Sequence, residues 1–159
     1  MFKVGDYVVY KKDVCKIIRM KEKDAAKFYV LNPIDDDSLT ITVDCNNEYL
    51  RNIISHQEAE EIILSIPNID IIDVNDKMIE SEYKKLLYSG SHYDLIKVIK
   101  TTYTRNDLRL KSGKKTVDKD KDYFEKAEKY LYNELSLALG MSFLECKEYI
   151  INKVSEIDK

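Results

Sequence analysis

Side chains that can bind phosphate are concentrated in the middle of the chain. Residues 77–121 carry 12 Lys and Arg against 6 Asp and Glu, a net charge of +6, although the whole chain has a net charge of −3. Such a local excess of positive charge attracts phosphate groups whatever the sequence of the nucleic acid that carries them. The candidate phosphate-contacting residues are Lys84, Lys85, Lys97, Lys100, Arg105, Arg109, Lys111, Lys114 and Lys115.

The same basic run has a plainer interpretation as the solvated faces of helices. Lys97 and Lys100 are three positions apart and share a helix face, and Arg105 and Arg109 share one if the helix extends that far. Charged runs on helices usually do no more than face water. Both interpretations stay open on this pattern, and neither predicts readout of base sequence.

Residue types that build catalytic or metal sites are scattered. His56 and His92 each follow a serine that is expected to start a helix, which is an ordinary place for a polar residue. The acidic run 35–37 lacks the spaced ligands and closing Glu of a calcium loop, and the three cysteines are far apart in sequence. No glycine-rich phosphate loop or nucleophile elbow occurs. We therefore predict no catalytic residue, no metal and no cofactor, and we do not expect an enzyme.

The composition is that of a globular protein. Hydrophobic residues make up 44% and charged residues 35% of the 159 residues, which is too apolar for a disordered chain. No apolar run approaches the roughly 20 residues that cross a bilayer, and no stretch has the basic-then-apolar form of a signal peptide. The sequence predicts a cytoplasmic protein.

Two segments with different periodicities follow each other along the chain. Residues 1–54 contain short runs rich in β-branched and aromatic residues, separated by turns, which favours a meander curled into a small barrel. The expected strands are residues 7–10, 15–20, 28–31, 39–43 and, more weakly, 49–54.

Helical spacing replaces strand alternation from residue 55 onward. Serines at 55, 91 and 142 are each followed three positions later by an acidic residue, a pattern typical of helix N-termini. Residues 105–120 are polar and are expected to form an exposed loop. The expected helices are residues 55–65, 76–88, 91–103, 118–139 and 142–157. The predicted fold is α+β, with a β-module at 1–54 and an all-α bundle of four to five helices at 55–159.

Three stretches in this order resemble the CarD/CdnL family of bacterial transcription regulators, whose N-terminal module is shared with the transcription-repair coupling factor. Each stretch alone is weak, because a Lys-Val-Gly-Asp strand also opens unrelated SH3-like modules. The stretches are residues 2–10; residues 28–31 with 39–43; and residues 86–90 leading into 95–99, joined later by 127–135.

The resemblance implies a fold, two partners and a site. It implies that the N-terminal module is Tudor-like and docks on the β subunit of RNA polymerase, and that the helical domain contacts promoter DNA at the upstream edge of the melting bubble. It implies no membrane and no small-molecule substrate, and a location on the nucleoid through polymerase. The expected docking residues are Arg19, Lys21, Lys23, Tyr29, Leu39, Thr40, Ile41 and Thr42.

The chain departs from the family at two positions. The family inserts a tryptophan into the DNA minor groove, whereas this chain has no Trp and places Asp76 at or near that position. Met78 or Ile79 could act as the wedge instead, since apolar side chains unstack base steps, but both also fit a helix core. The second departure is Thr42, which stands where the family has an arginine, so docking would depend on backbone pairing along that strand.

Two functions follow as hypotheses. The first is a regulator that tethers itself to polymerase through residues 1–54 and contacts promoter DNA through a basic helical face, which changes open-complex stability. The second is a protein-interaction adaptor that binds polymerase or another partner and makes no DNA contact. The missing tryptophan and the net acidity favour the second, and the local charge of +6 favours the first.

Overall fold

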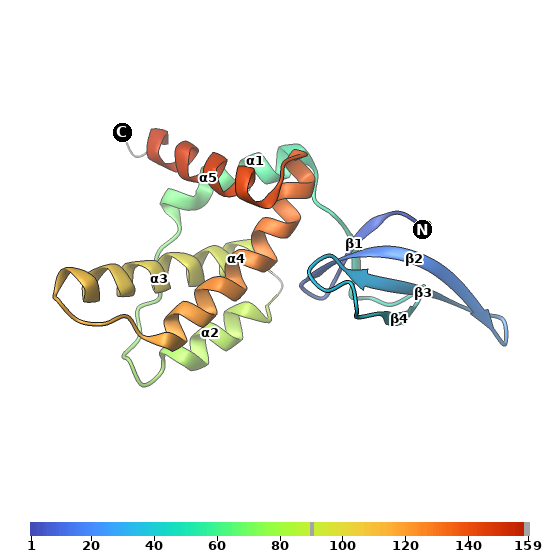
Figure 1. Ribbon diagram of the computed structural model, residues 1–159, viewed down its shortest axis with the longest axis horizontal. Coiled ribbons are helices and arrows are strands. Elements are labelled where there is room, and N and C mark those ends of the chain that lie inside the picture. The colour runs from blue at the N-terminus through green and yellow to red at the C-terminus, as the bar shows by residue number, and fades with distance from the viewer. Residues whose placement is uncertain (90, 158–159) are drawn as a thin grey trace. The chain divides into compact units, whose positions relative to one another are not determined.

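The computed structural model describes residues 1–89 and 91–157 and divides the chain into two compact units, Met1–Ile54 and Ser55–Lys159 (Figure 1). The first is a five-stranded antiparallel sheet and the second consists of helices. The predicted α+β class, with a small β domain and a helical C-terminal part, is confirmed. Each unit is described separately below.

The β unit is a meander with two edge strands. Its sheet order is β4-β3-β2-β1-β5, so β4 and β5 form the edges of this order. The turn between β2 and β3 consists of Asp24 and Ala25, both with positive φ (52° and 68°), as a tight hairpin turn requires. The strands are β1 (Tyr7–Tyr10), β2 (Asp13–Lys23), β3 (Ala26–Pro33), β4 (Ile41–Asp44) and β5 (Leu50–Asn52).

The β2–β3 hairpin is longer than the sequence pattern predicts. Lys21, Glu22 and Lys23 continue β2 and pair with Phe28, Lys27 and Ala26 of β3. These charged residues lack the strand composition on which the prediction depends, but the two-residue turn lets pairing continue to the tip. The extension matters because it carries two of the predicted docking residues.

One face of the sheet is the core of the β unit. The buried residues of this face include Val8, Cys15, Ile17, Leu31 and Val43. They alternate along their strands with residues of the other face, as the period of two of a β-strand requires, and that other face also buries Val9, Val14 and Val30. The core therefore fixes which way every side chain on these strands points.

A bulge in β2 reverses that alternation halfway along the strand. Ile17 pairs with Leu31, but Arg19 pairs with Val30, the next residue of β3, so Ile18 is an extra residue in β2. Because Ile17 faces the core, an unbroken strand would also turn Arg19 toward it. The bulge instead places Arg19 and the alternate residues that follow on the opposite face.

In its described residues the helical unit contains five α-helices, which agrees with the four to five predicted. The sequence-predicted capping box is present, because Ser55 Oγ accepts from the Glu58 amide and the Glu58 carboxylate accepts from the Ser55 amide. Gly140 ends α4 with a φ of 68°, in the left-handed conformation that glycine favours. The elements are α1 (His56–Ser65), a 3-10 helix (Ile66–Asn68), α2 (Ile79–Leu87), α3 (His92–Lys111), α4 (Asp118–Leu139) and α5 (Phe143–Ile157).

The exposed loop predicted for residues 105–120 is wrong over most of its length. Helix α3 continues to Lys111, α4 begins at Asp118, and only residues 112–117 connect them. Residues 105–111 are polar but include Arg, Leu and Lys, which are good helix formers, and Asp107 pairs with Lys111 one turn later. The polarity of this segment led to the prediction of a loop, whereas residues 105–111 form the C-terminal end of helix α3.

Helix α4 is the centre of the helical unit and packs against α1, α2, α3 and α5. Ala127, Leu131 and Leu135 are at most 1% exposed and form its apolar face. No described helix has the length and apolar character needed to cross a membrane.

The three cysteines differ enough to give a testable prediction. Cys15 and Cys146 are buried, and burial raises the pKa of their thiols to about 12 and about 11, whereas Cys45 is only half-buried. Because the thiolate is the reactive form, we expect iodoacetamide at pH 8 to modify Cys45 well before the other two. Mass spectrometry of tryptic peptides over time measures the order. Equal rates at all three sites would contradict this burial pattern.

Candidate partner-binding surfaces

The outer edge of β4 offers backbone groups to a partner strand. The Cys45 amide donates to the Lys27 carbonyl over 3.0 Å, so residues 45, 43 and 41 direct their backbone bonds toward β3. In an antiparallel ladder the alternate residues point the other way, and these are Thr42 and Asp44. Both side chains are exposed, and β4 is the last strand of its sheet order. This is the geometry that strand addition needs.

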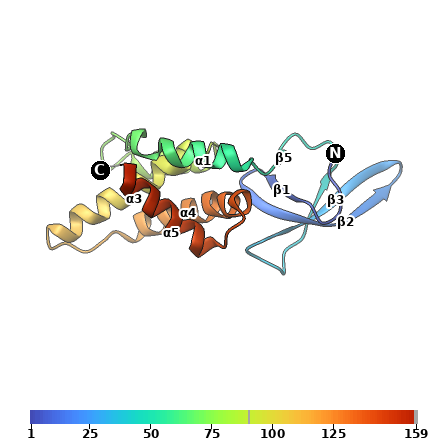
Figure 2. The same cartoon turned by 90° about the horizontal axis from the view of Figure 1, so that it is seen from above.

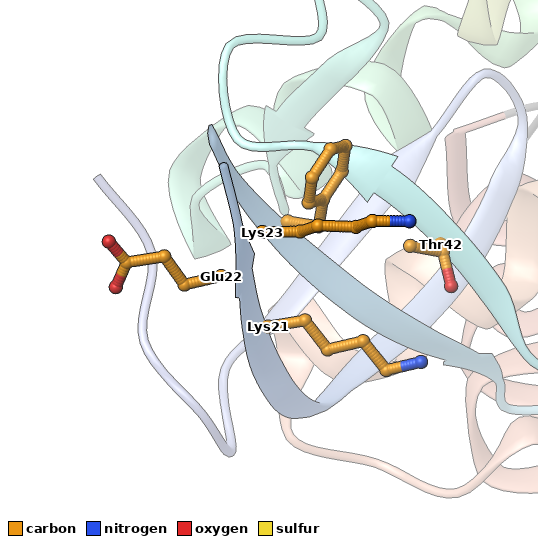
Figure 3. A pocket seen from close by; sticks show the side chains of 5 residues that line it. Lys21, Glu22, Lys23 and Thr42 are labelled. Atoms are coloured by element: carbon orange, nitrogen blue, oxygen red, sulfur yellow. The ribbon is translucent and has the colours of Figure 1, made fainter. Parts of the chain in front are cut away.

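A basic face adjoins this edge. Pairing puts Lys21 opposite Phe28, and Arg19 and Thr42 both opposite Val30, so these side chains share the face away from the core. Figure 3 shows Lys21 and Lys23 extending from β2 toward Thr42, while Glu22 points the opposite way. An open hollow of about 500 Å³ lies here, lined by Lys21, Glu22, Lys23, Phe28 and Thr42.

Two of the predicted docking residues belong to the core instead. Tyr29 is fully buried, and its hydroxyl donates to the Phe2 carbonyl (3.2 Å) and accepts from the Phe2 amide (3.1 Å). Its side chain is therefore unavailable to a partner, and we correct that assignment. Ile41 is half-buried against the same core. Arg19, Lys21, Lys23, Leu39, Thr40 and Thr42 are exposed.

Three of the nine predicted phosphate-contacting cations are held within the helical unit. Lys100 Nζ donates to the carbonyl oxygens of Ile66 (2.8 Å) and Ile69 (2.5 Å), where it satisfies the end of the 3-10 helix. Arg109 Nε donates to the Lys115 carbonyl over 2.7 Å and closes the α3–α4 loop. Lys100 and Arg109 are half-buried, so we reassign both to structural roles.

Arg105 is the third engaged cation. Its Nε lies 3.1 Å from Asp120 Oδ2, and its Nη1 lies 2.9 Å from Asp76 Oδ1. These two hydrogen bonds raise the pKa of the guanidinium further above its ordinary value. In this arrangement Arg105 is paired and does not offer a free charge.

Five of the six remaining cations form two separate groups, and the sixth, Lys97, lies in the first half of α3. Lys84 and Lys85 lie at the end of α2, shortly before α3 begins, whereas Lys111 is the last residue of α3 and Lys114 and Lys115 follow it. A 20-residue helix is roughly 30 Å long, so the two groups lie about a helix length apart. Figures 1 and 2 show the α3–α4 loop at one end of the helical unit. The predicted phosphate-contacting residues therefore do not form one continuous patch.

The exposed lysines differ in their local partners. Lys84 lies 3.7 Å from Glu80, and Lys111 lies 2.9 Å from Asp107. Within the described residues, Lys85, Lys114 and Lys115 are exposed and form no ion pair, and Lys97 is half-buried. The α3–α4 loop therefore has the largest excess of free positive charge among the predicted sites.

The two wedge candidates, Met78 and Ile79, differ in how far their side chains are exposed. Ile79 is 8% exposed and packs inside the helical unit, so it cannot act as a wedge, and we correct that assignment. Met78, just before α2, is 52% exposed and free to contact a partner. Asp76, at the position expected for the family's tryptophan, is held by Arg105.

Neither histidine belongs to a potential metal-binding group among the described residues. His92 Nε2 lies 2.8 Å from Glu134 Oε1, which joins the start of α3 to α4, and His56 lies 4.0 Å from Glu60 one turn along α1. In residues 1–89 and 91–157, no group of three or more His, Cys, Asp or Glu residues is placed to hold a metal ion.

An apolar groove is a further surface that the sequence pattern did not predict. It has a volume of about 500 Å³, lies among α3, α4 and α5, and is lined chiefly by residues such as Ile99, Phe124, Ile150 and Val154. Helical periodicity cannot show where two neighbouring helices diverge, so the sequence pattern alone does not reveal this groove. Phe28 of the β unit lines the hollow beside β4 but was not predicted as a site residue. The reason is similar, because the residues that it pairs with lie on two other strands.

The β unit combines an open strand edge with a basic face, and a helical unit follows it in the chain. Comparison with known proteins specifies the β unit further. Residues 2–54 match the CarD-like/TRCF RID domain, so the resemblance predicted for the N-terminal unit is confirmed. This domain family binds the RNA polymerase β subunit and is not enzymatic, which implies a transcription-related role. The match ends at residue 54 and does not extend to the helical unit. No curated protein matches the chain.

Proposed function

We propose that this protein is a transcription regulator that docks on the β subunit of RNA polymerase through residues 1–54 and brings its helical unit to promoter DNA. The observation that carries the proposal is the outer edge of β4 in a domain whose family binds polymerase. The proposed setting is the cytoplasm, on the nucleoid.

Docking by strand addition fits the side chains around this edge. Backbone groups of Thr42 and Asp44 supply directional hydrogen bonds, which do not depend on the identity of the side chain. Loss of the family's arginine at position 42 therefore leaves the main source of affinity in place. Lys21, Lys23 and Arg19, on the adjacent face, add electrostatic attraction to an acidic partner surface.

The DNA contact in this proposal is weak alone and effective when tethered. The exposed lysines of the α3–α4 loop contact backbone phosphates without reading bases. Polymerase supplies a high local concentration of promoter DNA, so a contact with low intrinsic affinity still changes the lifetime of the open complex. Met78 is the side chain available for a wedge in this arrangement.

An adaptor without DNA contact is the second candidate. A specific observation favours it: Lys100, Arg105 and Arg109, three of the nine predicted DNA-contacting residues, are engaged inside the helical unit. Fewer free charges remain than the sequence suggested, and they form two groups. In this candidate the helical unit binds a second protein, and charge reversal of the loop lysines has no effect on DNA.

Charge reversal in the α3–α4 loop distinguishes the two candidates. We expect the double variant Lys114→Glu and Lys115→Glu to weaken binding of the polymerase-bound protein to duplex DNA by about tenfold or more at low salt. The salt dependence should also decrease by about two counterions, one for each lost phosphate contact. Fluorescence anisotropy with labelled promoter DNA, over a series of salt concentrations, measures both quantities.

The control is a charge-matched double variant elsewhere in the helical unit. Lys121→Glu and Lys126→Glu make the same change in net charge at exposed positions of α4 that are outside the predicted set. An equal loss in both double variants would show that net charge alone is responsible. No loss in either variant would favour the adaptor.

A further inference from the structure

Arg105 is bound by two carboxylates whose surroundings differ sharply. The side chain of Asp120 is 2% exposed, and that of Asp76 is 86% exposed. The Arg105 side chain is itself 27% exposed, so part of the guanidinium reaches water. One of the two ion pairs is therefore a fixed part of the fold, and the other lies at the surface.

The buried pair fixes the position of the guanidinium. Asp120 Oδ2 accepts from Arg105 Nε, and Asp120 Oδ1 accepts from the Tyr83 hydroxyl over 2.9 Å. Tyr83 is 1% exposed, so the three side chains form a hydrogen-bonded link among α2, α3 and α4. The geometry of Arg105 thus depends on Asp120 and would persist without Asp76.

The surface pair is exchangeable. Exposed ion pairs contribute little free energy, because water and salt compete for both charges. Asp76 holds only Nη1 of a group that has five N–H donors, and the Arg105 hydrogen bond and charge lower the pKa of the Asp76 carboxyl. The positive charge of Arg109 also acts on this carboxyl, so an anion at this position lies in the field of two arginines.

The space around the surface pair can admit a larger anion. A hollow of about 330 Å³ opens here, lined in part by Asp76, Lys77, Arg105 and Lys119, and also by Glu80, which pairs with Lys119 at 2.7 Å. Phosphate has more oxygen acceptors than a carboxylate, and arginine binds it with parallel hydrogen bonds. Exchange of Asp76 for phosphate needs no new burial of Arg105, because the same donors change partner.

We propose that Arg105 is a phosphate-binding site for the DNA backbone that Asp76 occupies in the free protein. The side chain of Asp76 acts as an internal competitor, and a backbone phosphate displaces it when tethering brings DNA near. This inference rests on the DNA contact of the proposed function and adds one residue and one regulatory contact to it.

The experiment compares isosteric charge removal at two aspartates of one segment. Asp76→Asn removes the competing charge, and Asp73→Asn makes the same charge change at an exposed position that does not contact Arg105. We expect Asp76→Asn to raise the affinity of the full chain for random-sequence duplex DNA by about three- to fivefold at low salt and to steepen its salt dependence by about one counterion. Asp76→Glu, which keeps the charge, should bind nearly as wild type does.

Each outcome decides the inference. Equal gains in Asp76→Asn and Asp73→Asn, or no gain in either, would overturn it, and DNA binding lost only on loop-lysine reversal would still support the proposed function. Absence of DNA binding by wild type and by every variant, even at low salt and with polymerase present, would overturn both. Circular dichroism of each variant checks that the fold is retained.

Discussion

A proline at position 42 should weaken capture of the RNA polymerase β lobe by roughly tenfold or more. The Thr42 N–H points away from β3, so proline removes a donor from the outer edge without breaking the bonds that hold β4 in its sheet. A lost hydrogen bond that leaves a partner acceptor unsatisfied costs about 1–3 kcal/mol, so we expect roughly a tenfold or greater loss of affinity. Biolayer interferometry with full-length Thr42→Pro and immobilised β lobe measures it.

Thr42→Val is the matched control for this substitution. Valine keeps the backbone N–H and has nearly the shape of threonine, so docking that depends on the backbone should survive it. Loss of binding in both variants would mean that the hydroxyl, and not the strand edge, is recognised. Retained binding in the proline variant, with a folded β unit, would exclude pairing along β4 at this position.

Removal of Asp120 should cause the largest loss of stability among substitutions at polar positions. Asp120→Ala leaves the Arg105 guanidinium and the buried Tyr83 hydroxyl without their shared acceptor. Loss of this acceptor leaves the buried Tyr83 hydroxyl unsatisfied and removes one of the two carboxylate partners of the partly exposed Arg105, at about 1–3 kcal/mol for each group. Urea unfolding followed by circular dichroism should show that decrease in the free energy of unfolding of the helical unit.

Asp118→Ala tests whether this effect is specific to the buried position. Asp118 lies in the same first turn of α4 but is exposed, so its loss should cost only about 0.5 kcal/mol through the helix dipole. Tyr83→Phe, which removes one hydroxyl, should cost an intermediate amount of about 1–3 kcal/mol. A cost for Asp120→Ala no larger than that for Asp118→Ala would contradict the assigned network.

Local sequence signals predicted most of the fold because they act over short distances. Ser55 and Glu58 are three residues apart, and Gly140 marks the end of α4 through its own backbone. The prediction of the fold is wrong where the length of an element depends on contacts between residues far apart in the sequence. The β2–β3 hairpin is lengthened by cross-strand pairing, and α3 continues past Arg105, a residue anchored to Asp120 of another helix.

The candidate sites were less predictable for the same physical reason. A count of lysines and arginines gives charge but not availability, and availability depends on partners far along the chain. Lys100 meets carbonyl groups more than 30 residues away, and Arg105 meets Asp76 at a separation of 29 residues. Tyr29 was misassigned because the strand pattern could not show that its hydroxyl is satisfied by Phe2.

The extra residue in β2 has a consequence for how this hairpin can change over evolution. Ile18 is accommodated as a bulge, and the residues that pair on either side of it, Ile17 with Leu31 and Arg19 with Val30, are already consecutive along β3. Deletion of Ile18 would therefore give a regular ladder and leave Arg19, Lys21 and Lys23 on the face opposite Ile17. At this point the hairpin can change in length by one residue, as well as in composition, without moving its three cations to the core side.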